Sequence, residues 1–317
     1  MKLVLIGVGQ LGKILAKAVT ERPGFEIVGA VDAAPELHGV DLAELVPQLP
    51  PGIVIEKYTR GLLNRVKADA AIVTTVSRLV DVMDTLKEVI SCSLPLVCTC
   101  EELSYPWRTA PRLAGDLDVL ARRRGVAVLG AGVNPGFLMD YLPLVMSSVC
   151  SSIERIKISR IQDASSRRMQ FQNKIGAGMT VTEFEEKQLN GGFGHIGLIE
   201  SIDLLSDAFK WQISEIKNSI APVIGADGKV AGIEQIASAI ADGVEKIELY
   251  FRAAVGETDP HDSIEIIGQP SFSSRIAGGI HGDVASAAII LNAAAALRRT
   301  SAGLHTMADF PIPHWKL

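Results

Sequence analysis

Short apolar runs separated by amphipathic stretches occupy the first half of the chain. The runs predict strands, because continuous apolar segments of this length are typical of strands that are buried on both faces. They cover residues 1–6, 25–32, 52–55, 69–75, 94–100 and 126–130. Helices are expected between them over 13–20 and 79–91 and in the segment that ends at 124. Buried strands that alternate with helices predict an α/β fold with a parallel sheet.

The pattern changes beyond about residue 150, where apolar and polar positions alternate. This alternation predicts half-exposed strands, which are typical of antiparallel sheets. The alternating segments are 156–159, 246–251 and 263–267. We therefore expect a second α+β domain with a mostly antiparallel sheet.

Two helices are expected within this second domain. One begins at Thr180, where Glu183 completes a capping box, and ends at Asn190–Gly191. The other covers residues 196–209 and carries an apolar stripe on one face. Both are flanked by the expected strands, so they belong to the same α+β unit.

The tail contains a nearly continuous apolar helix over residues 284–299. A helix that is apolar all round has to be buried, so we expect it to return to the first domain or to join a subunit interface. The expected boundaries are 1–135 for the first domain, 136–282 for a domain that binds substrate and dimerises, and 283–317 for the tail. The apolar helix and the antiparallel sheet favour a homodimer.

Composition narrows the classes of partner. The chain has 317 residues and a net charge of −5, with Lys and Arg spread along its length. A nucleic-acid surface needs a concentrated basic face, so such a partner is not expected. No apolar run reaches the roughly 18 residues of a membrane helix, and the chain opens on an expected strand rather than a signal peptide. We expect a soluble, cytoplasmic protein that does not bind a membrane.

The four cysteines do not predict a metal site. Cys98 and Cys100 lie two residues apart in an apolar strand, and no second pair supplies metal-ligand spacing. The histidines and glutamates show no metal-binding spacing either. The cysteines are therefore expected to be reduced thiols.

A glycine-rich turn follows the first strand at once. Gly7 permits a tight turn, Gly9 lets a pyrophosphate approach the backbone, and Gly12 lets the following helix pack close to the strand. Gln10 and Leu11 open that helix, whose first N–H groups and partial positive charge favour phosphate. A strand, this turn and a helix in that order predict a Rossmann domain that binds a dinucleotide.

Asp32 ends the second strand, twenty residues past Gly12, where a ribose-binding acid is expected. A carboxylate accepts both ribose hydroxyls of NAD and repels the extra phosphate of NADP. We therefore expect NAD. Use of NADP stays open, because His38 or a distant Lys or Arg could fold over the site. The alternative is that Asp32 only caps the next turn.

Ligands of parallel sheets lie at the carboxyl ends of the strands. Thr74 and Thr75 end one strand and are expected near the nicotinamide ribose. Glu101 and Glu102 end the next, where a partly buried carboxylate can hold an ammonium group or shuttle a proton. They are the candidate catalytic residues. Alternatively, they stabilise a helix N-terminus.

Two further side chains are candidates for substrate contact. Asn134 follows the last strand of the first domain, where its amide could touch the nicotinamide carboxamide or the substrate, or simply form a turn. His195 lies at the mouth of a helix and could donate to a substrate oxygen or act as an acid, or it could be structural.

Several segments together resemble the 2,4-diaminopentanoate dehydrogenases and the related native amine dehydrogenases, whose architecture is similar to that of dihydrodipicolinate reductase. The resemblance rests on Glu101–Glu102, 132–140, 174–178, 194–201 and 306–311. It implies NAD(P)-dependent oxidative deamination of an amine to a ketone, with reductive amination by ammonia in reverse. It also implies that Glu101, or alternatively Glu102, positions the amine.

The substrate and two rival functions stay open. A diamino acid needs a cation for its carboxylate, and the second domain offers Arg160, Arg167, Arg168 and Lys174, with Arg168 as the candidate substrate-binding residue. If they point to solvent, a simple alkyl amine is expected instead. A dihydrodipicolinate reductase-like imine reductase is disfavoured, because that family's lysine motif and histidine pair are missing. A non-catalytic NAD-sensing protein is the other alternative.

Overall fold

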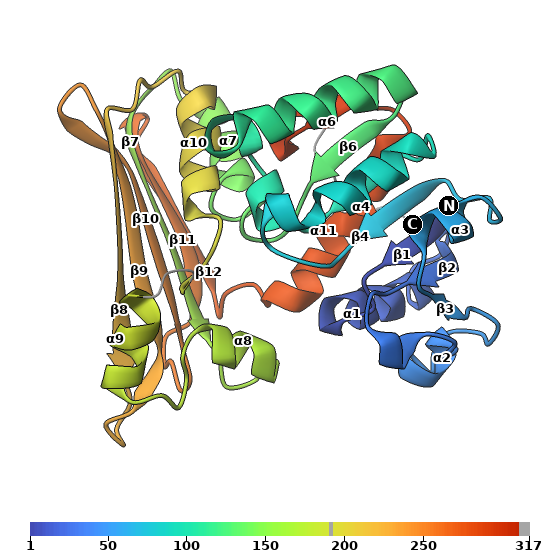
Figure 1. Cartoon of the computed structure of the whole chain (residues 1–317). Coiled ribbons are helices and arrows are strands. Elements are labelled where there is room, and N and C mark those ends of the chain that lie inside the picture. The colour runs from blue at the N-terminus through green and yellow to red at the C-terminus, as the bar shows by residue number, and fades with distance from the viewer. Residues whose placement is uncertain (190–192, 311–317) are drawn as a thin grey trace. The chain divides into compact units, whose positions relative to one another are not determined.

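The computed structural model describes residues 1–189 and 193–310, in which the chain forms two compact units (Figure 1). The first unit combines Met1–Phe137 with the segment that starts at His281. The second unit is Leu138–Ile280. Within the described residues, no helix is both long and apolar enough to cross a membrane.

The first unit contains a parallel sheet of seven strands in the order β13-β6-β5-β4-β1-β2-β3. The strands are β1 Lys2–Ile6, β2 Glu26–Val31, β3 Ile55–Glu56, β4 Ala70–Val73, β5 Leu96–Cys98, β6 Ala127–Gly130 and β13 Gly303–His305. The chain runs outward from β1 in both directions, to β2 on one side and to β4 on the other. Ligands of such sheets bind where the strand order reverses, above the carboxyl end of β1.

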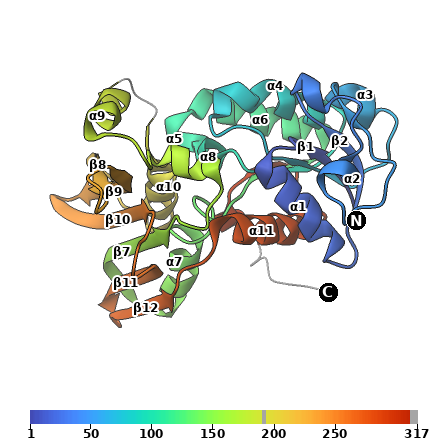
Figure 2. The ribbon, with the colours of Figure 1, turned by 90° about the horizontal axis from the view of Figure 1, so that it is seen from below.

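Helices cover both faces of this sheet. They are α1 Gln10–Thr20, α2 Leu42–Leu45, α3 Thr59–Leu63, α4 Leu79–Ser91, α5 Pro106–Thr109, α6 Pro111–Arg124 and α11 Gly282–Leu297, with short 3-10 turns η1 Pro35–Leu37, η2 Glu101–Leu103 and η4 Met307–Asp309. Figure 2 shows α1 beside α11 on one face and α4 beside α6 on the other. The apolar stripe of α4 is buried against the sheet, so burial of that stripe fixes the helix in place.

The C-terminal helix α11 packs within the first unit, against α1, β4 and β5. Most of its side chains are buried, but Val284 in its first turn is 63% exposed. The expectation of burial on all sides is therefore wrong at Val284, whereas Gly282 and Asp283 in the same turn are buried. After α11 the chain adds β13 beside β6, which extends the parallel sheet at its edge.

The second unit contains a six-stranded sheet in the order β12-β11-β7-β10-β9-β8. Its strands are β7 Ser152–Asp163, β8 Glu215–Ile224, β9 Val230–Ala241, β10 Val244–Ala254, β11 His261–Gln269 and β12 Phe272–Ala277. The pair β7–β10 is parallel, and the other neighbouring pairs are antiparallel. The expected fold class, a parallel Rossmann sheet joined to a mostly antiparallel α+β domain, is confirmed.

The helices of the second unit are α7 Tyr141–Met146, α8 Met169–Lys174, α9 Val181–Leu189 and α10 Leu198–Ala208, with the 3-10 turn η3 Ser147–Val149. The expected capping box is present at α9, where the Glu183 carboxylate accepts from Thr180 N and the Thr180 hydroxyl accepts from Glu183 N. The predicted end at Asn190–Gly191 lies outside the described residues. The helix expected from residue 196 begins at Leu198, because Gly197 precedes it with φ +120°.

One transverse row of residues crosses the second sheet in register. Its members are paired across neighbouring strands in the order Ile276, Asp262, Arg160, Phe251, Gln235 and Ile220. Side chains that are directly opposite one another on neighbouring strands point to the same face of a sheet. The strand register therefore brings together polar residues that lie far apart in the sequence.

Candidate functional site

The glycine turn joins β1 to α1 through close backbone contacts. Gly7 has φ +97°, and its N–H donates to Val31 O at 2.8 Å. A Cβ atom on Gly7 would lie 2.6 Å from Thr74 O, and one on Gly12 would lie 2.1 Å from Gly7 O. A Cβ on Gly9 would have nothing within 4 Å. Gly7 and Gly12 are therefore required by the turn itself, whereas Gly9 borders open space.

This open space is part of a pocket above the carboxyl ends of β1, β2 and β4. Its walls are formed by Ile6, Gly7, Gly9, Val31, Asp32, Ala33, Lys57, Tyr58, Thr59, Thr74, Thr75, Thr85 and Glu88. Gln10 and Leu11 form the first turn of α1, where backbone N–H groups have no partner within the helix. The expected phosphate-binding turn, Asp32 and both threonines thus meet at one site.

Asp32 is held firmly at this pocket. One carboxylate oxygen accepts from Val8 N at 2.6 Å and the other accepts from Ala34 N at 2.8 Å. A carboxylate has about four lone-pair positions, so each oxygen can accept a further hydrogen bond. The ring of His38 lies 3.0 Å from the backbone oxygen of Asp32, which ties that side chain to the same turn.

The two threonines differ in their surroundings. The hydroxyl of Thr74 is buried and donates to Gly7 O at 2.7 Å, so Thr74 supports the glycine turn. Thr75 is exposed at the pocket wall. The residues of this pocket fit a dinucleotide, because helix N–H groups and open space for a phosphate lie beside a fixed carboxylate.

Sequence reasoning missed part of the pocket wall. Lys57, Tyr58 and Thr59 follow the carboxyl end of β3, and Thr85 and Glu88 lie on α4. The sequence did not indicate Thr85 and Glu88, because the apolar stripe of α4 predicts only which face of the helix is buried. The rule that ligands lie at the carboxyl ends of strands could have identified Lys57 and Tyr58.

The glutamate pair follows β5, at the same sheet edge as the glycine turn, and lies in η2. The Glu102 carboxylate accepts from Leu79 N at 2.7 Å, at the first residue of α4. The helix-stabilising interpretation therefore describes the contact of Glu102. Glu101 is partly buried. Its backbone oxygen accepts hydrogen bonds from the N–H of Ser104 at 3.1 Å and from the hydroxyl of Ser104 at 2.7 Å.

The thiols below this edge are buried in the core. Burial raises the pKa of Cys98 to about 12, and burial together with the neighbouring Cys98 raises the pKa of Cys100 as well. All four cysteines are free, as expected. Among the described residues, no group of three or more His, Cys, Asp and Glu side chains could hold a metal ion.

Asn134 lies in the turn that follows β6. The Asn134–Pro135 peptide bond is cis, and Gly136 has φ +113°. A Cβ atom on Gly136 would lie only 2.8 Å from Gly132 N. Val133 N lies 3.4 Å from the hydroxyl oxygen of Ser286 on α11. The half-buried Asn134 side chain is therefore carried by a closely packed turn in the first unit.

His195 is carried by the second unit. Its ring stacks on Phe251, with centroids 4.4 Å apart and planes 15° apart. Gln235 accepts from His195 N at 2.8 Å and donates to His195 O at 3.3 Å and to Asn218 Oδ1 at 3.1 Å. Phe251 and Gln235 are neighbours in the transverse row, so the sheet supports both the ring and the backbone of His195.

The charge state of His195 follows from its surroundings. Burial lowers the pKa of His195 well below its ordinary value, and the positive charges of Lys174, Arg160 and Arg167 lower it further. The imidazole is therefore neutral near pH 7 and can donate one hydrogen bond. The protonated form needed for an acid role is disfavoured.

The basic side chains of the second unit have different partners. Arg160 is 1% exposed, and it donates to Asp262 at 2.7 Å and to Ile280 O at 3.0 Å. The interpretation of Arg160 as a residue available to a substrate is therefore unsupported, because Asp262 holds it. Arg167 donates to Gln162 at 2.5 Å and lies over the ring of Phe171. Arg168 and Lys174 are half-buried and lie at the two ends of α8.

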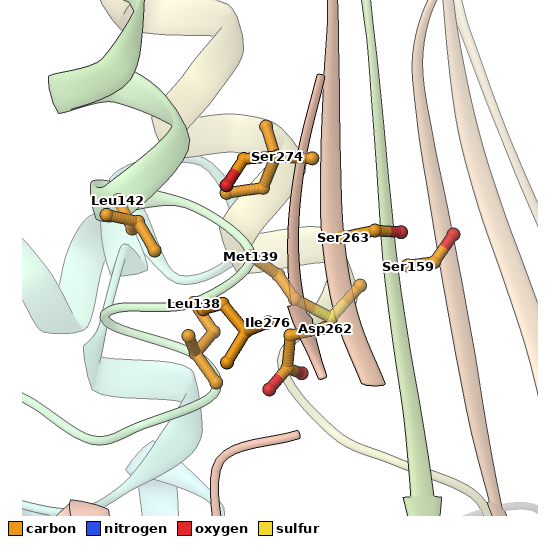
Figure 3. Close-up of a pocket in the computed structure, with 9 residues that line it drawn as sticks. Leu138, Met139, Leu142, Ser159, Asp262, Ser263, Ser274 and Ile276 are labelled. Atoms are coloured by element: carbon orange, nitrogen blue, oxygen red, sulfur yellow. The ribbon is translucent and has the colours of Figure 1, made fainter. Parts of the chain in front are cut away.

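A small cavity lies beside the Arg160 ion pair. Figure 3 shows Leu138, Met139, Ile276 and Asp262 around it. The cavity has room for about one water molecule. Because it is so small, it cannot hold an organic substrate.

Two family models match the chain. One describes the 2,4-diaminopentanoate dehydrogenase C-terminal domain and matches residues 137–316, more than half of the chain. The other describes the dihydrodipicolinate reductase N-terminus and matches residues 1–100.

Similar proteins and structures agree with these matches. The 2,4-diaminopentanoate dehydrogenase of Acetoanaerobium sticklandii is 28% identical over 99% of this chain and 94% of its own length. The structure of an amine dehydrogenase from Mycobacterium smegmatis has a TM-score of 0.88 at 21% identity and covers 100% of this chain and 97% of its own. A biliverdin reductase from Synechocystis, in complex with biliverdin and NADP+, has a TM-score of 0.57 at 11% identity and covers 97% and 94%. These two structures show the same fold.

Proposed function

This chain belongs to the 2,4-diaminopentanoate dehydrogenase family, and we propose that it oxidises an amine to a ketone with NAD as the hydride acceptor. It is a nicotinamide-dependent oxidoreductase acting on an amine. In the proposed reaction an amine, NAD+ and water give a ketone, ammonia, NADH and a proton. Reductive amination of the ketone is the reverse.

The match over residues 137–316 carries this proposal. The glycine turn and parallel sheet are shared by many dinucleotide enzymes and do not specify the reaction. The dihydrodipicolinate reductase model matches only the part of the chain that contains this shared architecture. The amine specificity is therefore assigned from residues 137–316, which include the whole second unit, and the cofactor from residues 1–100.

The first unit supplies the proposed cofactor site. Gly9 and the first turn of α1, with Gln10 and Leu11, hold the pyrophosphate, and Asp32 accepts the ribose hydroxyls. Thr75 and Asn134 are proposed to lie near the nicotinamide end, and this is supported for Thr75 by its position in the pocket wall. Thr74 holds the glycine turn. A bound nicotinamide ring supplies the hydride acceptor. We favour NAD over NADP, because Asp32 is fixed by two backbone N–H groups.

Glu101 is the proposed catalytic residue. It follows β5 at the carboxyl edge of the sheet, where its carboxylate can hold the amine and then help a water molecule attack the imine. Glu102 is the weaker candidate, because its carboxylate already accepts from Leu79 N.

The second unit supplies the proposed substrate contacts. His195 is the proposed hydrogen-bond donor to the substrate as a neutral imidazole, and Arg168 is the proposed partner of a substrate carboxylate. We favour an amino acid-like amine, such as a 2,4-diaminopentanoate-like compound, over a simple alkyl amine, because the half-buried cations Arg168 and Lys174 lie at the two ends of α8. A homodimer is part of the proposal and is tested by the mass in solution.

The test is NADH oxidation with a panel of ketones, including 2-amino-4-oxopentanoate and short alkyl ketones, with and without high ammonium at alkaline pH. Ammonium-dependent oxidation supports the proposal, and a preference for the amino acid ketone supports the carboxylate contact. Oxidation that does not need ammonium would instead indicate an imine or carbonyl reductase. Measured NADH binding without any oxidation would favour the sensor alternative.

A further inference from the structure

Lys57 and Tyr58 are pocket-lining residues to which the proposed reaction gives no role. Tyr58 is 66% exposed although it is a large aromatic side chain. The Lys57 ammonium lies 5.1 Å from the centre of the Tyr58 ring. An exposed aromatic residue is ordinary on a protein surface, but this one borders a pocket that already contains a glycine turn and a carboxylate.

The sheet register places Lys57 next to Asp32. In the parallel pair of β2 and β3, Val31 is opposite Glu56, and Asp32 N donates to Glu56 O at 3.1 Å. Asp32 and Lys57 are the residues that directly follow β2 and β3. An acidic and a basic residue therefore lie at the carboxyl ends of adjacent strands, at the same edge of the same pocket.

The order of the strands sets the direction in which a dinucleotide extends. The phosphate-binding turn follows β1, the ribose-binding carboxylate follows β2, and Tyr58 follows β3, in the spatial order β1-β2-β3. A base attached to a ribose at Asp32 therefore points toward the β3 side. There the walls are Tyr58 on one side and Thr85 and Glu88 of α4 on another.

The acidic side chains of the pocket wall repel a 2′-phosphate on the ribose, and one basic side chain attracts it. Asp32 and Glu88 are acidic, and both are held, Asp32 by Val8 N and Ala34 N and Glu88 by Arg60 N at 3.1 Å. The fixed carboxylate of Asp32 cannot turn aside to admit a 2′-phosphate. Among the described residues that line this pocket, Lys57 is the one cation. Its flexible four-carbon stem lets the ammonium group move toward a phosphate at the ribose.

We propose that Tyr58 is the platform on which the adenine base stacks and that Lys57 sets the residual affinity for NADP. The inference rests on the proposed use of a nicotinamide dinucleotide and adds the residues that select it. Tyr58 contributes to NAD and NADP alike, because both carry the same adenine. Lys57 contributes to NADP alone, because only NADP carries the 2′-phosphate.

The test compares the dissociation constants of NADH and NADPH for the purified protein, measured by nucleotide fluorescence or calorimetry without any substrate. Lys57→Met is expected to weaken NADPH binding about tenfold and to leave NADH binding within about twofold, since one charge-assisted contact contributes on the order of 1.5 kcal/mol. The matched control is Lys67→Met, which removes an exposed lysine of the same unit that does not line the pocket. Equal loss for both nucleotides in Lys57→Met would overturn the assignment of Lys57.

Tyr58→Ala is expected to weaken NADH and NADPH by the same factor of about ten, as loss of base stacking does. Tyr58→Phe keeps the ring and is expected to bind both as the unchanged protein does. Competition by 5′-AMP and by 2′,5′-ADP places the effects at the adenosine end: Lys57→Met should weaken only 2′,5′-ADP. Unchanged binding in Tyr58→Ala would overturn the platform.

Nucleotide binding distinguishes a wrong assignment of Lys57 and Tyr58 from a wrong assignment of the reaction. A protein that binds neither dinucleotide would overturn both. Tight NADH binding with Lys57→Met and Tyr58→Ala indistinguishable from Lys67→Met would overturn the inference alone, and the ammonium-dependent reaction would stand.

Discussion

The two units hold their polar groups by different means. In the first unit the backbone builds the pocket: Gly7 and Gly12 permit close contacts, and Asp32 is fixed by two main-chain N–H groups. In the second unit side chains build the support: His195 rests on Phe251 and is held by the amide of Gln235. A site built by the backbone depends on local glycine spacing, whereas a site built by side chains depends on strand register between distant segments.

This difference has a chemical counterpart. The first unit presents N–H groups and carboxylates beside open space, which suits a cofactor that many enzymes share. The second unit presents a neutral imidazole among basic side chains, and there we propose that the substrate binds. The general part of the proposed reaction and its specific part are therefore supported by different kinds of structure.

The largest effect is expected for Glu101→Gln, which tests whether the chemistry belongs to the first unit. Loss of the carboxylate should lower turnover by about 10²–10⁴-fold, as loss of a general acid–base group does, and should leave NADH binding unchanged. Steady-state rates and nucleotide fluorescence measure the two quantities.

Glu102→Gln is the matched control. It weakens the contact with Leu79 N and should cost at most about 1 kcal/mol of stability without a comparable loss of turnover. If Glu102→Gln abolishes turnover and Glu101→Gln does not, the two roles are exchanged.

Arg160→Met tests the side-chain support of the second unit. It leaves the buried Asp262 carboxylate without its cation, so the free energy of unfolding should fall by about 3–5 kcal/mol. Replacing Asp262 by Leu in the same protein should recover much of that loss, because no buried charge then remains. Denaturant unfolding measures both variants, and a loss below about 1 kcal/mol in Arg160→Met would contradict a buried pair.

Gly12→Ala and Gly9→Ala separate folding from binding in the first unit. A Cβ on residue 12 meets Gly7 O at 2.1 Å, so Gly12→Ala should lower the unfolding free energy by about 1–3 kcal/mol and abolish NADH binding. Gly9→Ala meets nothing within 4 Å and should leave stability unchanged while weakening NADH binding. Thermal unfolding and nucleotide titration distinguish the two. Equal melting temperatures for both variants would show that the turn can relax around residue 12.

The smallest effect is the pH dependence of stability due to His195. Its pKa is lowered in the folded protein, so below its ordinary pKa the unfolded chain binds the proton more readily. Stability should therefore fall as the pH drops below about 6.5, by at most about 1.4 kcal/mol per pH unit for this one group. His195→Phe keeps a ring on Phe251 and should lack this component in denaturant unfolding from pH 7.5 to 5.5. Identical pH dependence of the two proteins would contradict a buried neutral imidazole.

Much of the first unit could be predicted, because most of its strands lie in continuous apolar runs, α1 and α4 each have a periodic apolar face, and α11 is a long apolar segment. The strand β13, Gly303–His305, was missed because three residues are too few for a pattern. In the second unit β8, β9 and β12 were not predicted, although β10 beside β9 and β11 beside β12 were. The β9 segment contains Gly and small residues, which weaken the alternation between apolar and polar positions.

The residues of the candidate site likewise include some that the sequence could predict and some that it could not. Gly7, Gly9, Gly12 and Asp32 could be predicted, because their spacing in the chain reflects their spacing in the fold. Gln235 could not, because it meets His195 across 40 residues of sequence and only the strand register brings them together. Spacing cannot reveal a contact of that kind.

The Arg160–Asp262 pair also marks where the second unit can be cut. Asp262 accepts from Ile280 N at 2.7 Å, and Arg160 donates to Ile280 O at 3.0 Å, so both polar groups of this last residue are held. A chimaera that grafts the second unit onto another cofactor domain therefore has to carry Ile280 with the graft. A junction one residue earlier would leave the position of both backbone partners of this buried ion pair to the residue that the other domain supplies. The two junctions of such a chimaera should accordingly lie between Phe137 and Leu138 and between Ile280 and His281.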